Sequence, residues 1–391
     1  MAKKRLTTRR RTVVLGLGTL AGVGLSTVTG GLKPLKEQIQ ALHVQRRNFA
    51  VVGNAPLRDR ATAKKLIYGA AGEYRTLSSD KEFAACFARE CAILVPEGEL
   101  KWKALRPSPD RFDFTRGDWL AEFARTHNML FRGHTLVWHE GLPKWFAGTV
   151  NKRNAEQILL EHIKTVVRHY AGKIHSWDVV NEAVFPKHGL SHGLRNSPWL
   201  QFLGLDYIDI AFRAAAEADP QALLVYNDFG LDYQYQEPKR VAVLKLLERL
   251  KLRGSPVQAL GIQAHLSGDS SRQFNRKMLK TFLRDVADLG LKILITELDV
   301  SDKNLPLDFS IRDRIVAGVY EDYLSVALEE PAVIAVLTWG LSDRYTSFDW
   351  TDLGKRADHS PVRPLPLDTG LKRKLAWNAI ARALKSRRAN G

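Results

Sequence analysis

The stretch "IHSWDVVNEAV", residues 174–184, begins like a buried strand and ends on a polar pair. Its apolar residues give way to Asn181 and then to the ionisable Glu182. A continuous apolar run of this length is typical of a strand in a parallel sheet whose two faces are both covered. One carboxyl group at the end of a strand proves little, so its meaning depends on how the other strands of the chain end.

Similar apolar runs recur from residue 66 onward. They alternate with stretches of helical apolar spacing, such as "NAEQILLEHIKTVVRHY" (154–170) and "EPKRVAVLKLLERLKLRG" (237–254). The predicted strands are 66–72, 91–98, 129–138, 174–182, 222–230, 259–266, 292–300 and 333–340. Eight strand–helix units of this kind predict an α/β protein with a single (β/α)8 TIM barrel. A doubly wound open sheet is the alternative, but "GAAGEYR" after the first strand is a poor phosphate-binding turn.

Seven of the eight predicted strands carry polar or aromatic residues toward their C-terminal ends. These residues are Glu97, His134, Asn181 with Glu182, Asn227 with Asp228, Gln263 with His265, Glu297 and Trp339. Barrel enzymes place their chemistry at this end, because the loops that follow the strands converge there. A single residue of this kind is ordinarily a turn former, but a set of this size predicts one functional site.

Two of these residues, Glu182 and Glu297, are 115 positions apart in the sequence and both face the same end of the predicted barrel. A pair of carboxyl groups across a site suggests glycoside hydrolysis, in which one group protonates the leaving oxygen and the other attacks or activates water. Asn181 and Trp177 flank Glu182, and an apolar setting favours a protonated acid. Glu182 is therefore predicted to be the acid.

The surroundings of Glu297 differ. Asp299 lies two residues further along, and His265 is expected on the neighbouring strand. A histidine held by Asp299 can donate a hydrogen bond to Glu297 and keep it ionised as a nucleophile. The alternative is that these acidic residues form buried ion pairs with a purely structural role.

Six motifs then resemble glycoside hydrolase family 10, the retaining endo-β-1,4-xylanases. In chain order they are "FRGHTLVWH" (131–139), "WDVVNEAV" (177–184), "LVYNDF" (224–229), "GIQAHL" (261–266), "ITELDV" (295–300) and "LTWGLSDRY" (337–345). The resemblance covers residues 57–385. It implies a retaining endo-β-1,4-glycanase that cleaves xylan by double displacement and needs neither a metal nor an organic cofactor.

The resemblance also implies roles for individual residues. Glu182 would be the acid/base, Glu297 the nucleophile, and Asn181 the partner of the sugar 2-hydroxyl. The supporting and substrate-binding residues would be Glu97, Lys101, His134, Trp138, Asn227, Gln263, His265, Asp299 and Trp339. A glycan-binding barrel without activity is an alternative, but it would be favoured by the loss of a glutamate, and both are present.

Three places depart from the family pattern. Gly98 in "PEGELKW" (96–102) replaces an asparagine, and Gly141 replaces a glutamine. Residues 346–350 lack the second tryptophan after "DRY", for which Phe348 or Trp350 could substitute. These changes affect the sugar-binding side of the site, so a decorated xylan or a bacterial envelope polysaccharide is a second candidate substrate.

The net charge of +17 is concentrated at the N-terminus, since residues 1–65 hold 14 Lys/Arg and 2 Asp/Glu. Arg10 and Arg11 precede an uncharged run over 13–32, which resembles a twin-arginine export signal. We expect 1–32 to be this signal or an uncleaved anchor, 33–56 a linker and 57–391 the catalytic domain. The protein is expected in the periplasm or outside the cell, with the export machinery and a polysaccharide as partners. It is expected to be a monomer and to bind no nucleic acid.

Cys86 and Cys91 are the only cysteines among the 391 residues. They are accompanied by no Cys/His cluster of the kind that holds zinc. A short-loop disulfide is one option, but two reduced and buried thiols are the better expectation.

Overall fold

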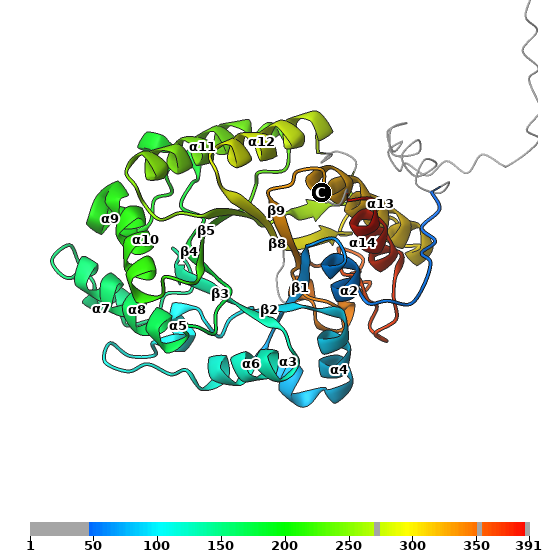
Figure 1. Ribbon diagram of the computed structural model, residues 1–391, viewed down its shortest axis with the longest axis horizontal. Helices are drawn as coiled ribbons and strands as arrows, with labels where there is room; N and C mark the ends of the chain where they lie inside the picture. Colours follow the sequence, from blue (N-terminus) through cyan, green and yellow to red (C-terminus); the bar gives the residue numbers. More distant parts are fainter. Residues whose placement is uncertain (1–46, 270–273, 350–353, 388–391) are drawn as a thin grey trace, which may run out of the picture.

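The computed structural model describes residues 47–269, 274–349 and 354–387. In this part of the chain nine strands form one sheet (Figure 1). In chain order they are β1 (Ile67–Gly72), β2 (Ile93–Pro96), β3 (Leu130–Val137), β4 (Ser176–Asn181), β5 (Leu223–Asp228), β6 (Ala259–Ile262), β7 (His265–Ser267), β8 (Lys292–Ser301) and β9 (Val333–Thr338).

The sheet closes on itself. Strands β1 to β6 pair in sequence order, β1 also pairs with β9, and β9 pairs with β8. The ring is completed because β6 pairs in parallel with β8. The predicted (β/α)8 barrel is therefore confirmed, and the open doubly wound sheet is excluded, since the strands that would be its edges pair with each other.

The sixth predicted strand, 259–266, differs from the structure. It is divided into β6 and β7, with Gln263 and Ala264 between them. Ala264 has a φ of 58°, in the left-handed region that an extended strand does not use. The interruption lets β7 pair with the far end of β8, where His265 lies opposite Asp299. A pattern of apolar residues alone could not reveal this break.

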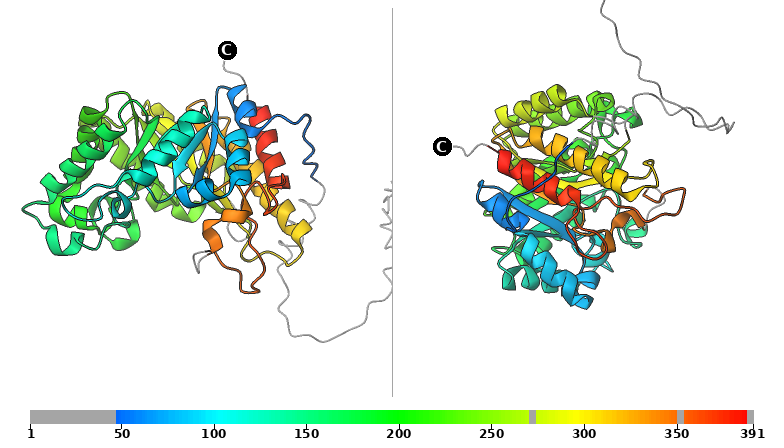
Figure 2. Two further views of the ribbon diagram at one scale, coloured as in Figure 1. Left: turned by 90° about the horizontal axis from the view of Figure 1, so that it is seen from below. Right: turned by 90° about the vertical axis from the view of Figure 1, so that its right-hand side faces the viewer.

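The helices form a layer around the barrel (Figure 1), and α13 and α14 lie side by side on one flank (Figure 2). Their bounds are α2 (Leu57–Thr62), α3 (Tyr74–Ser79), α4 (Lys81–Glu90), α5 (Trp102–Leu105), α6 (Thr115–Thr126), α7 (Phe146–Thr149), α8 (Ala155–His169), α9 (Pro198–Leu203), α10 (Tyr207–Ala218), α11 (Glu237–Leu252), α12 (Arg276–Asp288), α13 (Phe309–Ala327) and α14 (Leu375–Ser386).

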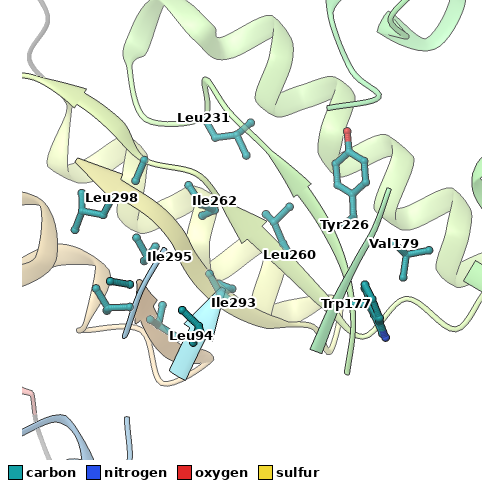
Figure 3. Packing of buried hydrophobic residues seen from close by; sticks show 14 of the residues in the cluster. Leu94, Trp177, Val179, Tyr226, Leu231, Leu260, Ile262, Ile293, Ile295 and Leu298 are labelled. Carbon is teal, nitrogen blue, oxygen red and sulfur yellow. The ribbon is translucent and has the colours of Figure 1, made fainter. Parts of the chain in front are cut away.

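Two apolar layers follow from the alternation of side chains along the strands. The interior of the barrel is filled by a cluster of Ala71, Ile93, Val95, Val225, Ala259, Leu294, Ala335 and Leu337. A larger layer between strands and helices includes Trp177, Tyr226 and Leu260 (Figure 3). Trp177 reaches across to β3, where a Cβ on Gly133 would lie 2.0 Å from its ring. Only glycine fits at that position.

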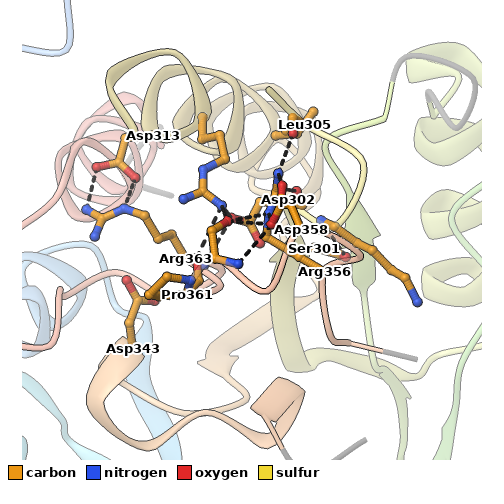
Figure 4. A network of polar contacts seen from close by, with 12 residues as sticks. Ser301, Asp302, Leu305, Asp313, Asp343, Arg356, Asp358, Pro361 and Arg363 are labelled. Atoms are coloured by element: carbon orange, nitrogen blue, oxygen red, sulfur yellow. Dashed lines mark hydrogen bonds and ion pairs between the residues drawn. The ribbon is translucent and has the colours of Figure 1, made fainter. Parts of the chain in front are cut away.

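A polar network holds the segment after β9 against the barrel (Figure 4). Arg356 donates hydrogen bonds to the carbonyl oxygens of Asp302 and Leu305. Arg363 forms two hydrogen bonds of 2.7 Å with Asp313 on α13. These bonds tie the loop that follows β9 to the loop that follows β8, so both frame the same end of the barrel.

The N-terminal part of the described chain packs on the barrel. Phe49 is buried, and Arg47 forms a 2.8 Å ion pair with Asp322 on α13. The predicted export signal, 1–32, lies outside the described residues, as does the first part of the predicted linker. In the described residues no helix combines the length and apolar character needed to cross a membrane. Cys86 and Cys91 are both buried and free, as expected.

Candidate active site

Glu182 and Glu297 both lie at the C-terminal end of the barrel. Glu182 directly follows β4, has a φ of 57°, and donates its backbone N–H to the Asn227 carbonyl at 2.8 Å. Glu297 lies within β8. Their side chains are 14% and 7% exposed. A positive φ is an unfavourable backbone conformation for a glutamate. Such strained residues are found mainly at functional sites, where the surrounding structure holds them in place.

An amide network connects the two carboxyl groups. The Asn227 side chain donates to Glu297 at 2.7 Å and to the Asn181 oxygen at 2.9 Å. Gln263 donates to Glu182 at 3.1 Å and to the same Asn181 oxygen at 3.3 Å. Asn181 itself donates to Glu182 at 3.3 Å. Side chains from three strand ends, those of β4, β5 and β6, therefore hold both glutamates in fixed positions.

Two residues that could not be predicted from the sequence hold Asn227 in place. The Thr296 hydroxyl donates to the Asn227 side-chain oxygen at 2.7 Å. A Cβ on Gly261 would lie 2.2 Å from that oxygen, so glycine is required there. Thr296 and Gly261 read as ordinary strand residues, and only the register of β5, β6 and β8 brings them to Asn227.

Glu297 is held in its charged form. Burial alone would raise its pKa, but a hydrogen bond from His265 and electrostatic interactions with His134 and His265 lower the pKa to about 2. His265 lies 3.2 Å from Glu297 through Nε2 and 2.9 Å from Asp299 through Nδ1. Burial acts to lower the pKa of His265, but the charge of Asp299 raises it well above the usual value. The predicted contacts between these three residues are therefore present.

Glu182 is shifted in the opposite direction. Burial raises its pKa most, and the negative charges of Asp228 and Glu297 add to the effect. The neighbour predicted from the sequence, Trp177, does not contribute, because its ring packs in the outer layer against β3 and Tyr170. That part of the prediction is wrong, since side chains alternate along a strand and that of Trp177 lies on the outer face of the barrel. The protonated acid is favoured by burial and by like charges.

His134 is oriented by a partner that was not predicted. Its Nδ1 lies 3.0 Å from Asp178 on β4, and Asp178 also binds the buried Arg132. Asp178 sits in the middle of an apolar run, where its position suggests only a buried strand. The ring of His134 meets the ring of Trp339 edge-on, with centroids 5.4 Å apart. Trp339 is thus placed over the barrel end by a histidine that is itself fixed.

A lysine lies between two indole rings in the same region. Lys101 Nζ is 4.9 Å from the centre of the Trp138 ring and 5.9 Å from that of Trp339. Burial lowers the pKa of Lys101, although the charges of Glu297 and Glu97 oppose the effect. Burial and the charge of Glu73 raise the pKa of Glu97 to about 8. Flat apolar rings beside polar donors are suited to a sugar.

Comparison with known proteins identifies the family. A model of glycosyl hydrolase family 10 matches residues 56–383. The chain belongs to this family. Endo-1,4-beta-xylanase A of Caldicellulosiruptor saccharolyticus is 38% identical over 304 residues, which cover 74% of this chain and 85% of the relative. Endo-1,4-beta-xylanase B of Thermotoga neapolitana is 35% identical over 298 residues, covering 75% and 83%.

Solved family 10 structures agree with this assignment. Native xylanase 10B from Thermotoga maritima has a TM-score of 0.77 and 34% identity, and the match covers 84% of this chain and 98% of that one. Xylanase 10B from Thermotoga petrophila, solved in complex with xylobiose, has the same TM-score and identity, with 86% and 99% covered. The resemblance read from the six motifs is confirmed for the whole barrel.

The two glycines that depart from the family 10 pattern have different surroundings. A Cβ on Gly98 would meet nothing within 4 Å. Gly141 has a φ of 67°, and its added Cβ would lie 3.5 Å from the Trp138 ring. A side chain can therefore be added freely at Gly98, whereas Gly141 occupies a backbone conformation that other residues adopt only at a cost.

A cavity of about 60 Å³ lies beside Glu97, over the ends of β1, β2 and β9. Its wall includes Glu73 and, from the segment without the second family 10 tryptophan, Thr346 and Ser347. Phe348 is described, but Trp350 lies outside the described residues. The small side chains of Thr346 and Ser347 therefore border a hollow next to Glu97.

Proposed function

We propose that this family 10 glycoside hydrolase is a retaining endo-1,4-β-xylanase that cleaves xylan by double displacement. One observation carries the proposal: two largely buried carboxyl groups, joined by shared amides, have pKa values shifted in opposite directions. Environments that separate two carboxyl pKa values divide the roles of acid and nucleophile. The named activities of the relatives, and the xylobiose bound to one of them, support the choice of substrate.

In the first step Glu182 donates its proton to the glycosidic oxygen while the Glu297 carboxylate attacks the anomeric carbon. The bond to the leaving sugar breaks, its electrons stay with the protonated oxygen, and an ester forms between Glu297 and the glycone. In the second step the Glu182 carboxylate takes a proton from water, which attacks the same carbon and releases Glu297. Asn181 offers its remaining amide hydrogen to the 2-hydroxyl of the reacting sugar.

The other predicted residues support these steps. His265, held by Asp299, keeps Glu297 ionised, and Asn227 orients it. The residues proposed to bind the glycone sugars are Glu97, Lys101, His134, Trp138, Gln263 and Trp339. A binding barrel without activity is disfavoured, because simple binding requires neither a strained glutamate nor opposed pKa shifts.

The stereochemistry of the product tests this proposal. Two displacements at the anomeric carbon retain its configuration, and carboxyl groups in retaining enzymes lie about 5–5.5 Å apart. We expect proton NMR of the early products of xylohexaose to show the β-anomer first, with the α-anomer appearing only as the sugar mutarotates. Release of the α-anomer first would contradict a double displacement, and a complete lack of cleavage would contradict the xylanase proposal.

Adding an amide at Gly98 is expected to improve the use of plain xylan. An asparagine there would offer a sugar about one more hydrogen bond, worth roughly 0.5–1.5 kcal/mol, or about 2- to 12-fold in affinity. We expect kcat/KM on xylotriose and xylohexaose to rise by about that factor in Gly98→Asn, and not in the matched Gly98→Ala. Equal values for both variants would mean that the missing amide does not limit binding.

Replacing Gly141 with glutamine is not expected to raise kcat/KM on plain xylan. Its left-handed backbone makes a glutamine cost about 1–2 kcal/mol, which offsets the hydrogen bonds it could add. If plain xylan is a poor substrate even for Gly98→Asn, a decorated xylan becomes the better candidate, because the cavity beside Glu97 can hold a small substituent.

We also propose that the protein is exported by the twin-arginine route, on the basis of Arg10, Arg11 and the weakly apolar run after them. Replacing both with lysine and fractionating the cells tests this. We expect the variant to remain in the cytoplasm, and unchanged delivery would point to another route.

A further inference from the structure

Arg195 lies against Glu182, although nothing in the sequence singles it out. It belongs to the loop between β4 and α9, and that loop folds back so that the Arg195 N–H bonds the Ala183 carbonyl at 2.8 Å. Its side-chain Nε donates to the Glu182 backbone carbonyl at 2.7 Å. Its Nη2 is 3.6 Å from the Glu182 carboxylate oxygen Oε2. One guanidinium group therefore contacts both the backbone and the carboxyl group of Glu182.

The guanidinium is held tightly in this position. Arg195 is buried and lies 4.6 Å from the centre of the Phe185 ring and 5.6 Å from that of Phe229. Its Nη2 is buried and forms no hydrogen bond with the part of the chain that the structure describes. Lys239, at 2.6 Å, is the cation that pairs with the nearby Asp228. The Arg195 Nη2 group, whose nearest carboxylate contact is Glu182 at 3.6 Å, is thus available to interact with that carboxyl group.

The two-step reaction makes opposite demands on Glu182. It must be protonated before the first step and ionised in the second. In the free enzyme burial and the charges of Asp228 and Glu297 raise its pKa. The charge of Glu297 disappears once that residue forms the ester, so one of these contributions is lost in the intermediate. The cation of Arg195 stays, and a cation close to a carboxyl group favours its ionised form.

We propose that Arg195 is a positioning residue that orients Glu182 and supports its carboxylate when it takes the proton from water in the second step. This inference rests on the proposed double displacement. Removing the cation should therefore slow the hydrolysis of the glycosyl-enzyme more than its formation. The effect acts through Glu182 and not through contact with the reacting atoms.

Several other ionisable groups surround this pair and stay the same in the variants. They are Asp228 on β5 with Lys239 on α11, Glu297 on β8 with His265 on β7, Lys101 after β2, His139 after β3, and His188 in the loop that carries Arg195. Burial and the charge of Arg195 lower the pKa of His139 to about 4, so His139 is neutral at neutral pH. Of these groups Lys101 is the other cation coupled to Glu182.

The test compares Arg195→Met, Arg195→Lys and the parent enzyme on 2,4-dinitrophenyl β-xylobioside, whose leaving group needs no proton. For Arg195→Met we expect kcat to fall roughly 10- to 100-fold, which is part of the about 10²- to 10⁴-fold that a general base contributes. KM should fall with it, because the covalent intermediate accumulates, so kcat/KM changes by less than about threefold. Mass spectrometry of the quenched reaction should show the covalent intermediate, and azide should restore turnover. The kcat of Arg195→Lys should lie between those of the parent and Arg195→Met.

The pH dependence gives a second readout. Loss of the cation raises the pKa of Glu182. The acid limb of kcat on the aryl substrate, which requires the carboxylate, should therefore move to higher pH in Arg195→Met. The alkaline limb of kcat/KM on xylan, which requires the protonated acid, should move in the same direction. The parent enzyme, measured in parallel, defines both limbs.

A matched control is Arg240→Met. Arg240 is also buried and donates to backbone carbonyls of a neighbouring loop, but its carboxylate partner is Glu237 and it does not touch Glu182. We expect no accumulation of intermediate in this variant. If Arg195→Met loses kcat and kcat/KM equally, without an intermediate or a pH shift, its role is structural only and the inference is overturned. If the parent does not cleave the xylobioside, the proposed function itself fails.

Discussion

Glu297→Ala is expected to abolish the cleavage of both xylan and activated aryl xylobiosides. Without the carboxylate no covalent intermediate can form, so kcat/KM should fall by on the order of 10⁵-fold, as for other nucleophile deletions. A good leaving group should not help, because protonation of that group is not what has been lost. The loss is measured as initial rates with both substrates. Near-normal activity on either would mean that another group is the nucleophile.

An external nucleophile sharpens the test. Azide can enter the space that the Glu297 side chain leaves and attack the anomeric carbon opposite the leaving group. A single displacement inverts the configuration, so the product should be the α-glycosyl azide. The isosteric Glu297→Gln is the matched control, since it keeps the volume and blocks azide. A β-azide from Glu297→Ala would contradict the assignment of this residue as the nucleophile.

The pKa of Glu297 explains why its loss should be felt over a wide pH range. With a pKa near 2, its carboxylate is fully charged at any pH above about 4. The fall in activity of the parent enzyme at acid pH should therefore not come from protonation of Glu297 near the usual pKa of a carboxyl group. His265, which Asp299 holds in place, lowers the pKa of Glu297 through its hydrogen bond to that residue.

The barrel could be predicted because its signals are local. Each strand is an apolar run and each helix has its own spacing, so the elements alternate visibly along the chain. The prediction fails where the local backbone conformation differs from that of the regular strand which the apolar pattern indicates. Ala264 divides one predicted strand in two, and β4 has an irregular register between Asp178 and Val180, so simple alternation does not show which residues share a face with Glu182.

The glutamates and their amide partners could also be predicted, because parallel strands bring their C-terminal ends to one place whatever their separation in sequence. The residues that hold the glutamates and their amide partners in place could not be predicted. Asp178 lies inside a strand, Gly261 looks like any strand glycine, and Arg195 lies in an irregular loop 13 residues after Glu182. Their importance depends on the register of the strands and on the conformation of a loop, and neither produces a periodic pattern in the sequence. Gly141, by contrast, reflects a backbone requirement as much as an altered sugar site.

Glu182→Ala is expected to give a loss that depends on the leaving group. On xylan the departing sugar oxygen needs a proton, and general acid catalysis contributes about 10²- to 10⁴-fold, so kcat/KM should fall by that factor. On 2,4-dinitrophenyl β-xylobioside the leaving group needs no proton, and kcat/KM should stay within about threefold of the parent. The matched control is Asp228→Asn, which removes a negative charge that raises the pKa of Glu182 without removing the acid.

The second step separates Glu182→Ala from Glu297→Ala. Without Glu182 no base deprotonates the attacking water, so kcat on the aryl substrate should fall while the intermediate accumulates and KM falls with it. Azide needs no base, and it attacks the intermediate from the face that the leaving group occupied. Turnover should then recover and the product should be the β-glycosyl azide, the opposite anomer from that expected for Glu297→Ala. Equal losses on xylan and on the aryl substrate, without rescue by azide, would remove Glu182 from the role of acid/base.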